Sequence, residues 1–281
     1  MKEPSQTELD LVKSLPALPI SAQKILRAFR DEEPDIYKIV DAIAIDPGVT
    51  TKLLAIANSA YYQTRRPCHS VRDAIVRLGL DEVKKLLLPV VISEQFDTKR
   101  CKNFRGDLYW KQALMVACAA KNIAEQTKSN LHEITASAAH VAGLLHNIGL
   151  IAMVHVFPDE MENIFNSVSE FQQYKLAHLK DGELNPGIVG TLLLHAWDIP
   201  EEISSIPHAS HPLYDERIEG ELSELIRFSI NWYEDKFSPV IHLPSFMIQA
   251  DVIPVQLQYA RRAVEREKNG LVKFADMLFY Y

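Results

Sequence analysis

Apolar residues recur at intervals of three and four along much of this chain, whereas runs of strict apolar–polar alternation are few. Residues three or four apart lie on one face of an α-helix, while alternation would indicate strands. Glycine, which often marks turns, occurs only ten times in 281 residues. The pattern predicts an all-α protein. Two of the clearest helical stripes are Ile36, Ile39, Val40 and Ile43, and then Val49, Leu53, Ile56 and Ala60.

Several helix ends in the first third of the chain carry capping residues. Asp46 followed by Pro47 predicts an N-cap and a first helical residue. Ser70 and Asp73 have the spacing of a capping box, and Gly79 is placed to end the helix that they begin. These local signals predict a succession of short helices.

The charged segment 97–106 has no apolar stripe and ends in glycine, so it is predicted to be a linker. It separates an N-terminal helical lobe, residues 1–96, from a second helical lobe, residues 107–212. Residues 213–281 are expected to form a C-terminal helical extension that packs on the second lobe. The predicted architecture is therefore two-lobed.

The last third of the chain is predicted in less detail. The segment PHASHPLY, residues 207–214, is expected to be a loop. Apolar periodicity then predicts three helices near residues 219–235, 254–267 and 270–281.

The charge balance is acidic, with a formal net charge of −7 and a pI near 5.8. A nucleic-acid-binding chain usually carries a basic balance or patch, so DNA or RNA binding is not expected. The three cysteines are far apart and have no metal-ligand spacing. No stretch approaches 18 consecutive apolar residues and the N-terminus has no signal-peptide layout, so no membrane association is expected. These features predict a soluble, cytoplasmic protein.

The segment 142–154, AGLLHNIGLIAMV, is the most informative stretch for function. Interpreted as one helix, it has a core-facing apolar stripe, and Gly143 and Gly149 would allow another helix to approach closely. Two polar neighbours, His146 and Asn147, interrupt this apolar sequence. Burying polar groups costs roughly 1–3 kcal/mol unless they are hydrogen-bonded, so this pair requires an explanation.

An aspartate at position 147 would provide that explanation, because adjacent imidazole and carboxylate groups can bind a divalent metal ion. Position 147 is instead an asparagine. Its neutral amide brings no charge to offset desolvation of the ion and bridges two metal ions poorly. The motif thus keeps the shape of a metal site without its anionic half.

Six segments, in this order and spacing, together resemble the HDOD domains of bacterial signalling proteins. That family is related to the His-Asp metal-dependent phosphohydrolases. The resemblance covers roughly residues 14–212 and implies an all-α, two-lobed fold with a non-catalytic role in signal transduction. The segments are LPALP (15–19), DPGVTTKLLAIANSAYY (46–62), HSVRDAIVRLG (69–79), YWKQAL (109–114), AGLLHNIG (142–149) and VGTLLLHAWDIPEEI (189–203).

The resemblance also implies where the metal site of the parent superfamily would fall. Its first histidine corresponds to Gln112, and its His-Asp pair corresponds to His146 and Asn147. A histidine expected before the VGTLLL segment falls near Asn185. These four residues define the vestigial HD pocket, for which no catalytic residue, metal or other cofactor is expected. If a metal is retained, the candidate ligands are His146 with the downstream histidines His208 and His211.

The sequence leaves more than one function open. The favoured one is a regulatory protein that acts through signalling proteins in trans or through a small ligand; homo-oligomerisation is left open. The alternative is a metal-dependent phosphohydrolase acting on a nucleotide or cyclic nucleotide. His140 and His146 are six residues apart, about 240° around a helix, so they cannot chelate one ion from a straight helix. Trp110 and Trp197 are expected in the core and His195 at the surface.

Overall fold

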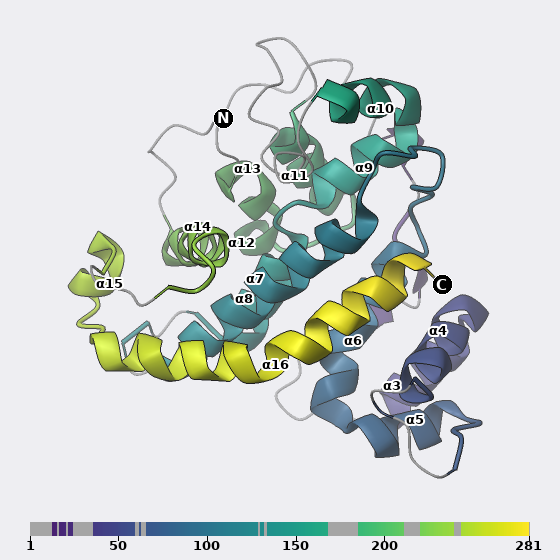
Figure 1. Ribbon diagram of the computed structural model, residues 1–281, viewed down its shortest axis with the longest axis horizontal. Coiled ribbons are helices and arrows are strands. Elements are labelled where there is room, and N and C mark those ends of the chain that lie inside the picture. Colours follow the sequence, from purple (N-terminus) through teal and green to yellow (C-terminus); the bar gives the residue numbers. More distant parts are fainter. Residues whose placement is uncertain are drawn as a thin grey trace. The chain divides into compact units, whose positions relative to one another are not determined.

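In the residues that it describes, the computed structural model consists of α-helices and their connections (Figure 1). All described elements are helical, which confirms the all-α prediction. The residues that the structure describes are 13–15, 17–20, 22–24, 36–59, 62, 66–128, 130–131, 134–167, 185–210, 220–238 and 243–280.

The chain divides into two compact units, as the two-lobed prediction requires. The smaller unit comprises Pro16–Asp97 and Lys273–Tyr281, and the larger unit comprises Met1–Leu15 and Thr98–Val272. The division after Asp97 falls in the segment 97–106, and the finer domain limits given above stay a prediction.

The smaller unit is built from helices with well-defined ends. Asp46 Oδ1 accepts hydrogen bonds from the backbone N–H groups of Gly48 and Val49 at 3.1 and 3.2 Å, which confirms it as an N-cap. The capping box of Ser70 and Asp73 is present. The helices are α3 (Ile36–Ala44), α4 (Pro47–Ala57), α5 (Val71–Leu78), α6 (Leu80–Ser93) and the last turns of α16.

The larger unit is organised around α7 (Gly106–Gln126), a helix buried along most of its length. This burial places Trp110 in the core, as predicted. α8 and α14 pack against α7, α11 packs between α9 and α13, and α10 follows α9 (Figure 1). The bounds are α8 (Ala136–Leu145), α9 (Ile148–Val156), α10 (Pro158–Ser167), α11 (Pro186–Ala196), α12 (Glu201–Ser204), α13 (Ile206–Ser210), α14 (Glu221–Glu234), α15 (Ser245–Gln249) and α16 (Pro254–Tyr280).

The sequence leaves open whether residues 130–153 form a helix pair or one long helix, and the structure shows a pair. α8 ends at Leu145 and α9 begins at Ile148, so His146 and Asn147 lie at a junction between two helices. His146 keeps helical angles, but Asn147 has φ −121° and ψ 25°, which ends the regular helix. The interruption therefore falls on the two polar residues that define the motif.

Two predictions for the last third of the chain are wrong. The expected loop at 207–214 begins with helical residues of α13, and its remaining residues lie outside the described part of the chain. The expected helices at 254–267 and 270–281 are one continuous helix, α16. The helix continues through Gly270, because glycine inside a helix costs only about 1 kcal/mol. Burial of the apolar side chains Val264, Leu271 and Phe274 offsets this cost.

One apolar segment bears on the expectation that the chain does not associate with a membrane. In the described part of the chain, Ala136–Val156 has the necessary length and composition. However, 78% of its most apolar window is buried inside the protein. A core helix of a soluble protein passes the same test, so this segment is weak evidence for a membrane span.

Candidate functional site

His146 lies at the junction between α8 and α9 and is 6% exposed. Its Nδ1 atom lies 2.7 Å from the carbonyl oxygen of Gly143. A carbonyl oxygen can only accept a hydrogen bond, so Nδ1 carries the proton of the neutral ring and Nε2 keeps its lone pair. Burial lowers the pKa of His146 to about 4, although the hydrogen bond to Gly143 opposes this shift. The imidazole is therefore neutral at physiological pH.

The two amides predicted to replace metal ligands on other helices occupy different environments. Gln112 is 6% exposed, on the buried central helix α7. Asn185 is the N-cap of α11, and its Oδ1 accepts the backbone N–H groups of Gly187 at 2.8 Å and Ile188 at 3.3 Å. The Asn185 oxygen is thus already engaged in satisfying the first turn of a helix. This capping role was not predicted, although an asparagine directly before Pro186 is a recognisable signal for it.

Of the two downstream histidines, only His208 lies in the described part of the chain. It is 8% exposed on α13, and its backbone N–H donates to Thr191 Oγ1 on α11 at 3.3 Å. His211 lies outside the described residues. The prediction that both histidines lie in a loop is therefore wrong for His208, which is a buried helical residue.

Glycines bring the helices that carry these residues into close contact. A Cβ atom added to Gly143 would lie 2.7 Å from Ala117 Cα on α7. A Cβ atom on Gly149 would overlap the carbonyl oxygen of Pro186 and lie 2.6 Å from the nitrogen of Gly190, both on α11. The predicted close approaches at Gly143 and Gly149 are confirmed. They place the start of α9, next to Asn147, directly against the start of α11, next to Asn185.

A third close approach joins α11 to α13. A Cβ atom on Gly187 would lie 3.1 Å from His208 Cα, and one on Gly190 would lie 2.7 Å from Pro207 Cβ. The region thus brings Asn147, Asn185 and His208 onto neighbouring backbone segments. It does so through tight backbone packing.

The donor set of this region does not fit a catalytic divalent metal. Three of the four positions of the vestigial HD pocket are neutral amides, and the fourth is a neutral imidazole. Catalytic zinc sites use three protein ligands, and two-metal hydrolases add bridging carboxylates. Among the described residues, no group of three or more histidine, cysteine or acidic side chains is arranged to hold a metal ion. His146 Nε2 remains as one suitable nitrogen ligand.

Other histidines and tryptophans singled out in the sequence have simpler placements. His195 is exposed and lies near Ser204 Oγ, with ring nitrogens at 3.5 Å. Trp197 is 7% exposed and belongs to the core, as predicted. His140 is half-buried on α8, six residues before His146.

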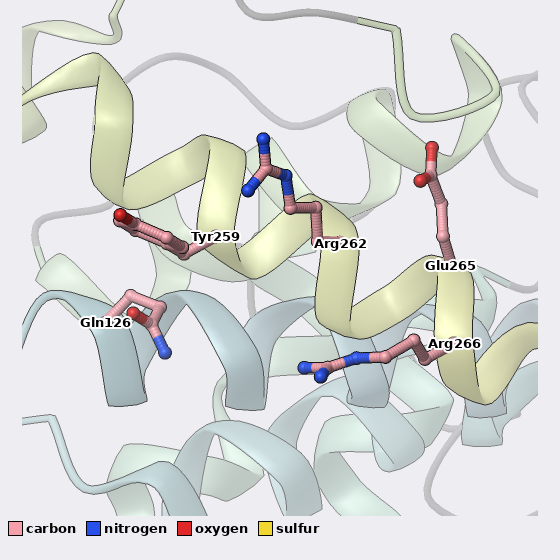
Figure 2. A pocket seen from close by; sticks show the side chains of 5 residues that line it. All are labelled: Gln126, Tyr259, Arg262, Glu265 and Arg266. Carbon is pink, nitrogen blue, oxygen red and sulfur yellow. The ribbon is translucent and has the colours of Figure 1, made fainter.

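A pocket on α16, lined by Tyr259, Arg262 and Arg266 among others, was not predicted from the sequence (Figure 2). Their spacing of three and four residues is present in the sequence. It places them on one side only because residues 254–280 form a single continuous helix. This pocket is a second candidate site, separate from the vestigial HD pocket.

Comparison with known proteins gives the same fold. A candidate signal transduction protein from Marinobacter aquaeolei VT8 superposes with a TM-score of 0.73 at 22% identity, covering 99% of this chain and 62% of that one. A candidate phosphohydrolase from Shewanella amazonensis SB2B gives 0.64 at 19% identity and covers 98% of both chains. An HDOD domain protein of unknown function from Geobacter sulfurreducens gives 0.61 at 21% identity, covering 98% of this chain and 99% of that one.

The helical fold and the histidine-centred junction define an all-α protein with an HD-phosphohydrolase-like architecture. The model of the HDOD domain matches residues 15–212, and the chain belongs to this family. An uncharacterised protein from Treponema pallidum (strain Nichols) is 24% identical over 213 residues. That match covers 71% of this chain but only 39% of the relative, so the chain spans less than half of that protein.

Proposed function

We propose that this chain is a regulatory HDOD protein that works by binding and not by hydrolysis. In this proposal the vestigial HD pocket has become a structural element of the larger unit. The observation that carries the proposal is the junction itself, where His146 is neutral and its acidic partner is replaced by Asn147.

The charge of the surrounding side chains decides whether this pocket can hold a metal ion. A divalent ion moved from water into a buried site needs anionic ligands to offset its desolvation. Gln112, Asn147 and Asn185 supply none, and the Asn185 oxygen already accepts two backbone hydrogen bonds. The pocket therefore lacks the carboxylates that would hold two metal ions and a hydroxide nucleophile between them.

The biological setting of the proposal is a cytoplasmic signalling pathway. Family membership supports a role in signal transduction, and one structural relative is a candidate signal transduction protein. The chain would act in trans on partner proteins or respond to a small ligand. Its acidic net charge of −7 makes nucleic acid an unsuitable partner.

A metal-dependent phosphohydrolase is the competing function, because one relative of the same fold is a candidate phosphohydrolase. One feature of the site favours it. The hydrogen bond from His146 Nδ1 to Gly143 leaves Nε2 unprotonated, which is the usual arrangement of a metal-ligating histidine.

Hydrolysis of bis(4-nitrophenyl) phosphate in the presence of Mn²⁺, Fe²⁺ or Zn²⁺ separates the two functions. The proposal predicts the same background rate for the wild type and for His146→Ala. A metal-dependent rate well above background that disappears in His146→Ala would establish the phosphohydrolase. Circular dichroism of both proteins serves as the folding control, and His195→Ala is the matched variant of an exposed histidine.

A further inference from the structure

The exposed face of α16 carries a stripe of side chains that the vestigial HD pocket does not use. Val255, Tyr259, Arg262 and Arg266 are spaced by four, three and four residues, so they share one side of the helix. All four are exposed, with Tyr259 at 51%. The opposite side, which includes Leu257, Ala260 and Val264, is buried. The stripe is therefore a solvent-facing surface of the larger unit.

A pocket of about 580 Å³ lies along this stripe (Figure 2). Three side chains, Tyr259, Arg262 and Arg266, form its α16 wall, and Gln126 reaches it from the end of α7. The fifth lining residue, Glu265, points away from Arg266 in the close-up view (Figure 2). The volume falls in the range of about 300–1,000 Å³ that is usual for small-molecule sites.

Hydrogen bonds hold the two walls together on either side of the pocket. Gln256 Nε2 donates to the backbone oxygen of Gln126 at 2.8 Å and to Asn130 Oδ1 at 3.0 Å. About one turn back along α7 and three turns further along α16, Asn122 Nδ2 lies 3.5 Å from Glu267 Oε1. The pocket lies between these two attachments, so its shape is fixed by the scaffold.

The charges in the pocket are unbalanced. Glu265 is already paired, because its Oε1 lies 3.1 Å from Arg261 Nε. Within the described residues, neither Arg262 nor Arg266 forms an ion pair, and Arg262 lies 5.9 Å from the centre of the Tyr259 ring. Two guanidinium groups four residues apart thus face the pocket without an anion of their own. The pocket is therefore locally positive in a chain whose net charge is −7.

We propose that this pocket binds a nucleoside phosphate. Guanidinium groups present planar, paired donors that match phosphate oxygens. The Tyr259 ring offers a face on which a planar base can stack, and the Gln126 amide can both donate and accept a hydrogen bond at the base edge. An aromatic ring beside two unpaired arginines fits a ligand that joins a planar ring to a phosphate. The site goes beyond the proposed function and shares no residue with the vestigial HD pocket.

Isothermal titration calorimetry of the full chain tests the site with GMP, AMP, guanosine and inorganic phosphate as probes. We expect at least one mononucleotide to bind, and guanosine and inorganic phosphate to bind at least about tenfold more weakly. Losing a charge-assisted hydrogen bond costs about one order of magnitude in affinity, so Arg262→Gln and Arg266→Gln should each weaken binding about tenfold. Tyr259→Ala should weaken it further, whereas Tyr259→Phe should retain it.

Lys268→Gln is the matched control, because it removes one exposed positive charge from another side of α16 and should leave binding unchanged. The proposal is overturned if no mononucleotide binds, or if the arginine substitutions change affinity no more than Lys268→Gln does. Equal binding of inorganic phosphate and GMP would show a simple anion site and would also overturn it. Binding of an oligoribonucleotide or an acidic peptide, without binding of any mononucleotide, would overturn the proposal too. None of these results bears on hydrolysis at His146, so the two proposals fail separately.

Discussion

The α8–α9 junction and the exposed face of α16 use polar side chains in opposite ways. At the junction, the polar groups are bound to backbone: the buried His146 to the Gly143 carbonyl and, nearby, the half-buried Asn185 to the first turn of α11. On α16, Arg262 and Arg266 are exposed and have no ion pair in the described part of the chain. Polar groups that are already satisfied stabilise a fold, whereas unpaired charges at a pocket remain available to a ligand. This difference supports the two proposals, in which the first region is structural and the second binds a ligand.

The largest expected effect is at the glycines of the junction. Gly149→Ala would drive a Cβ atom into the Pro186 carbonyl, and backbone atoms cannot move aside as a side chain can. We expect a loss of roughly 3–5 kcal/mol in the free energy of unfolding, or failure to fold. Urea denaturation measures it. Gly48→Ala is the control, because its Cβ would meet the movable Glu94 side chain at 2.9 Å. Equal stability of both variants would contradict the tight packing.

The second effect concerns pH. Burial lowers the pKa of His146 to about 4, below its usual value near 6.5, so the unfolded chain binds more protons between these limits. The contribution of His146 to stability is complete above pH 6.5 and is lost as the pH falls towards 4. At pH 5 the loss is about 2 kcal/mol. Unfolding of the wild type and of His146→Gln should therefore converge as the pH is lowered. Parallel pH profiles would mean that His146 is not buried in its neutral form.

A smaller effect is expected at the cap of α11. Asn185→Ala removes the acceptor of two backbone N–H groups and should cost about 1 kcal/mol. Asn185→Asp should be neutral or stabilising, because a carboxylate interacts favourably with a helix N-terminus. Thermal unfolding of the three proteins distinguishes these outcomes. Loss of stability in Asn185→Asp would show that the side chain does more than cap the helix.

The smallest effect on stability is expected on α16. Arg262→Gln and Arg266→Gln remove exposed side chains without ion pairs, so the free energy of unfolding should change by less than about 0.5 kcal/mol. Urea denaturation at neutral pH measures it. A loss above about 1 kcal/mol in either variant would show that the arginines support the fold and would weaken the contrast between the two regions.

The sequence predicted best what is decided locally. Asp46, the Ser70–Asp73 capping box and Gly79 act on backbone groups within a few residues, and the structure confirms all of them. The close approaches at Gly143 and Gly149 were also predicted, because only the absence of a side chain explains glycine there. These signals need no knowledge of the rest of the fold.

The remaining features depend on tertiary packing. The break at Asn147, the helical state of His208 and the continuity of α16 through Gly270 are set by contacts between distant segments. For the candidate site, the sequence supplied the residues Gln112, His146, Asn147 and Asn185 but not their roles. The capping by Asn185 is a local feature that the Asn185–Pro186 pair could have indicated, whereas the pocket beside Tyr259 depends on the packing of α16 against α7.

We propose that the vestigial HD pocket lacks the charge to hold a catalytic metal. The most direct measurement is the metal content of the purified chain by inductively coupled plasma mass spectrometry, after growth with added zinc, manganese and iron. The Asn147→Asp variant, which restores the carboxylate, is measured in parallel. We predict far less than one metal ion per wild-type chain and an increase in the variant. One or two ions per wild-type chain, lost on His146→Ala, would contradict the account.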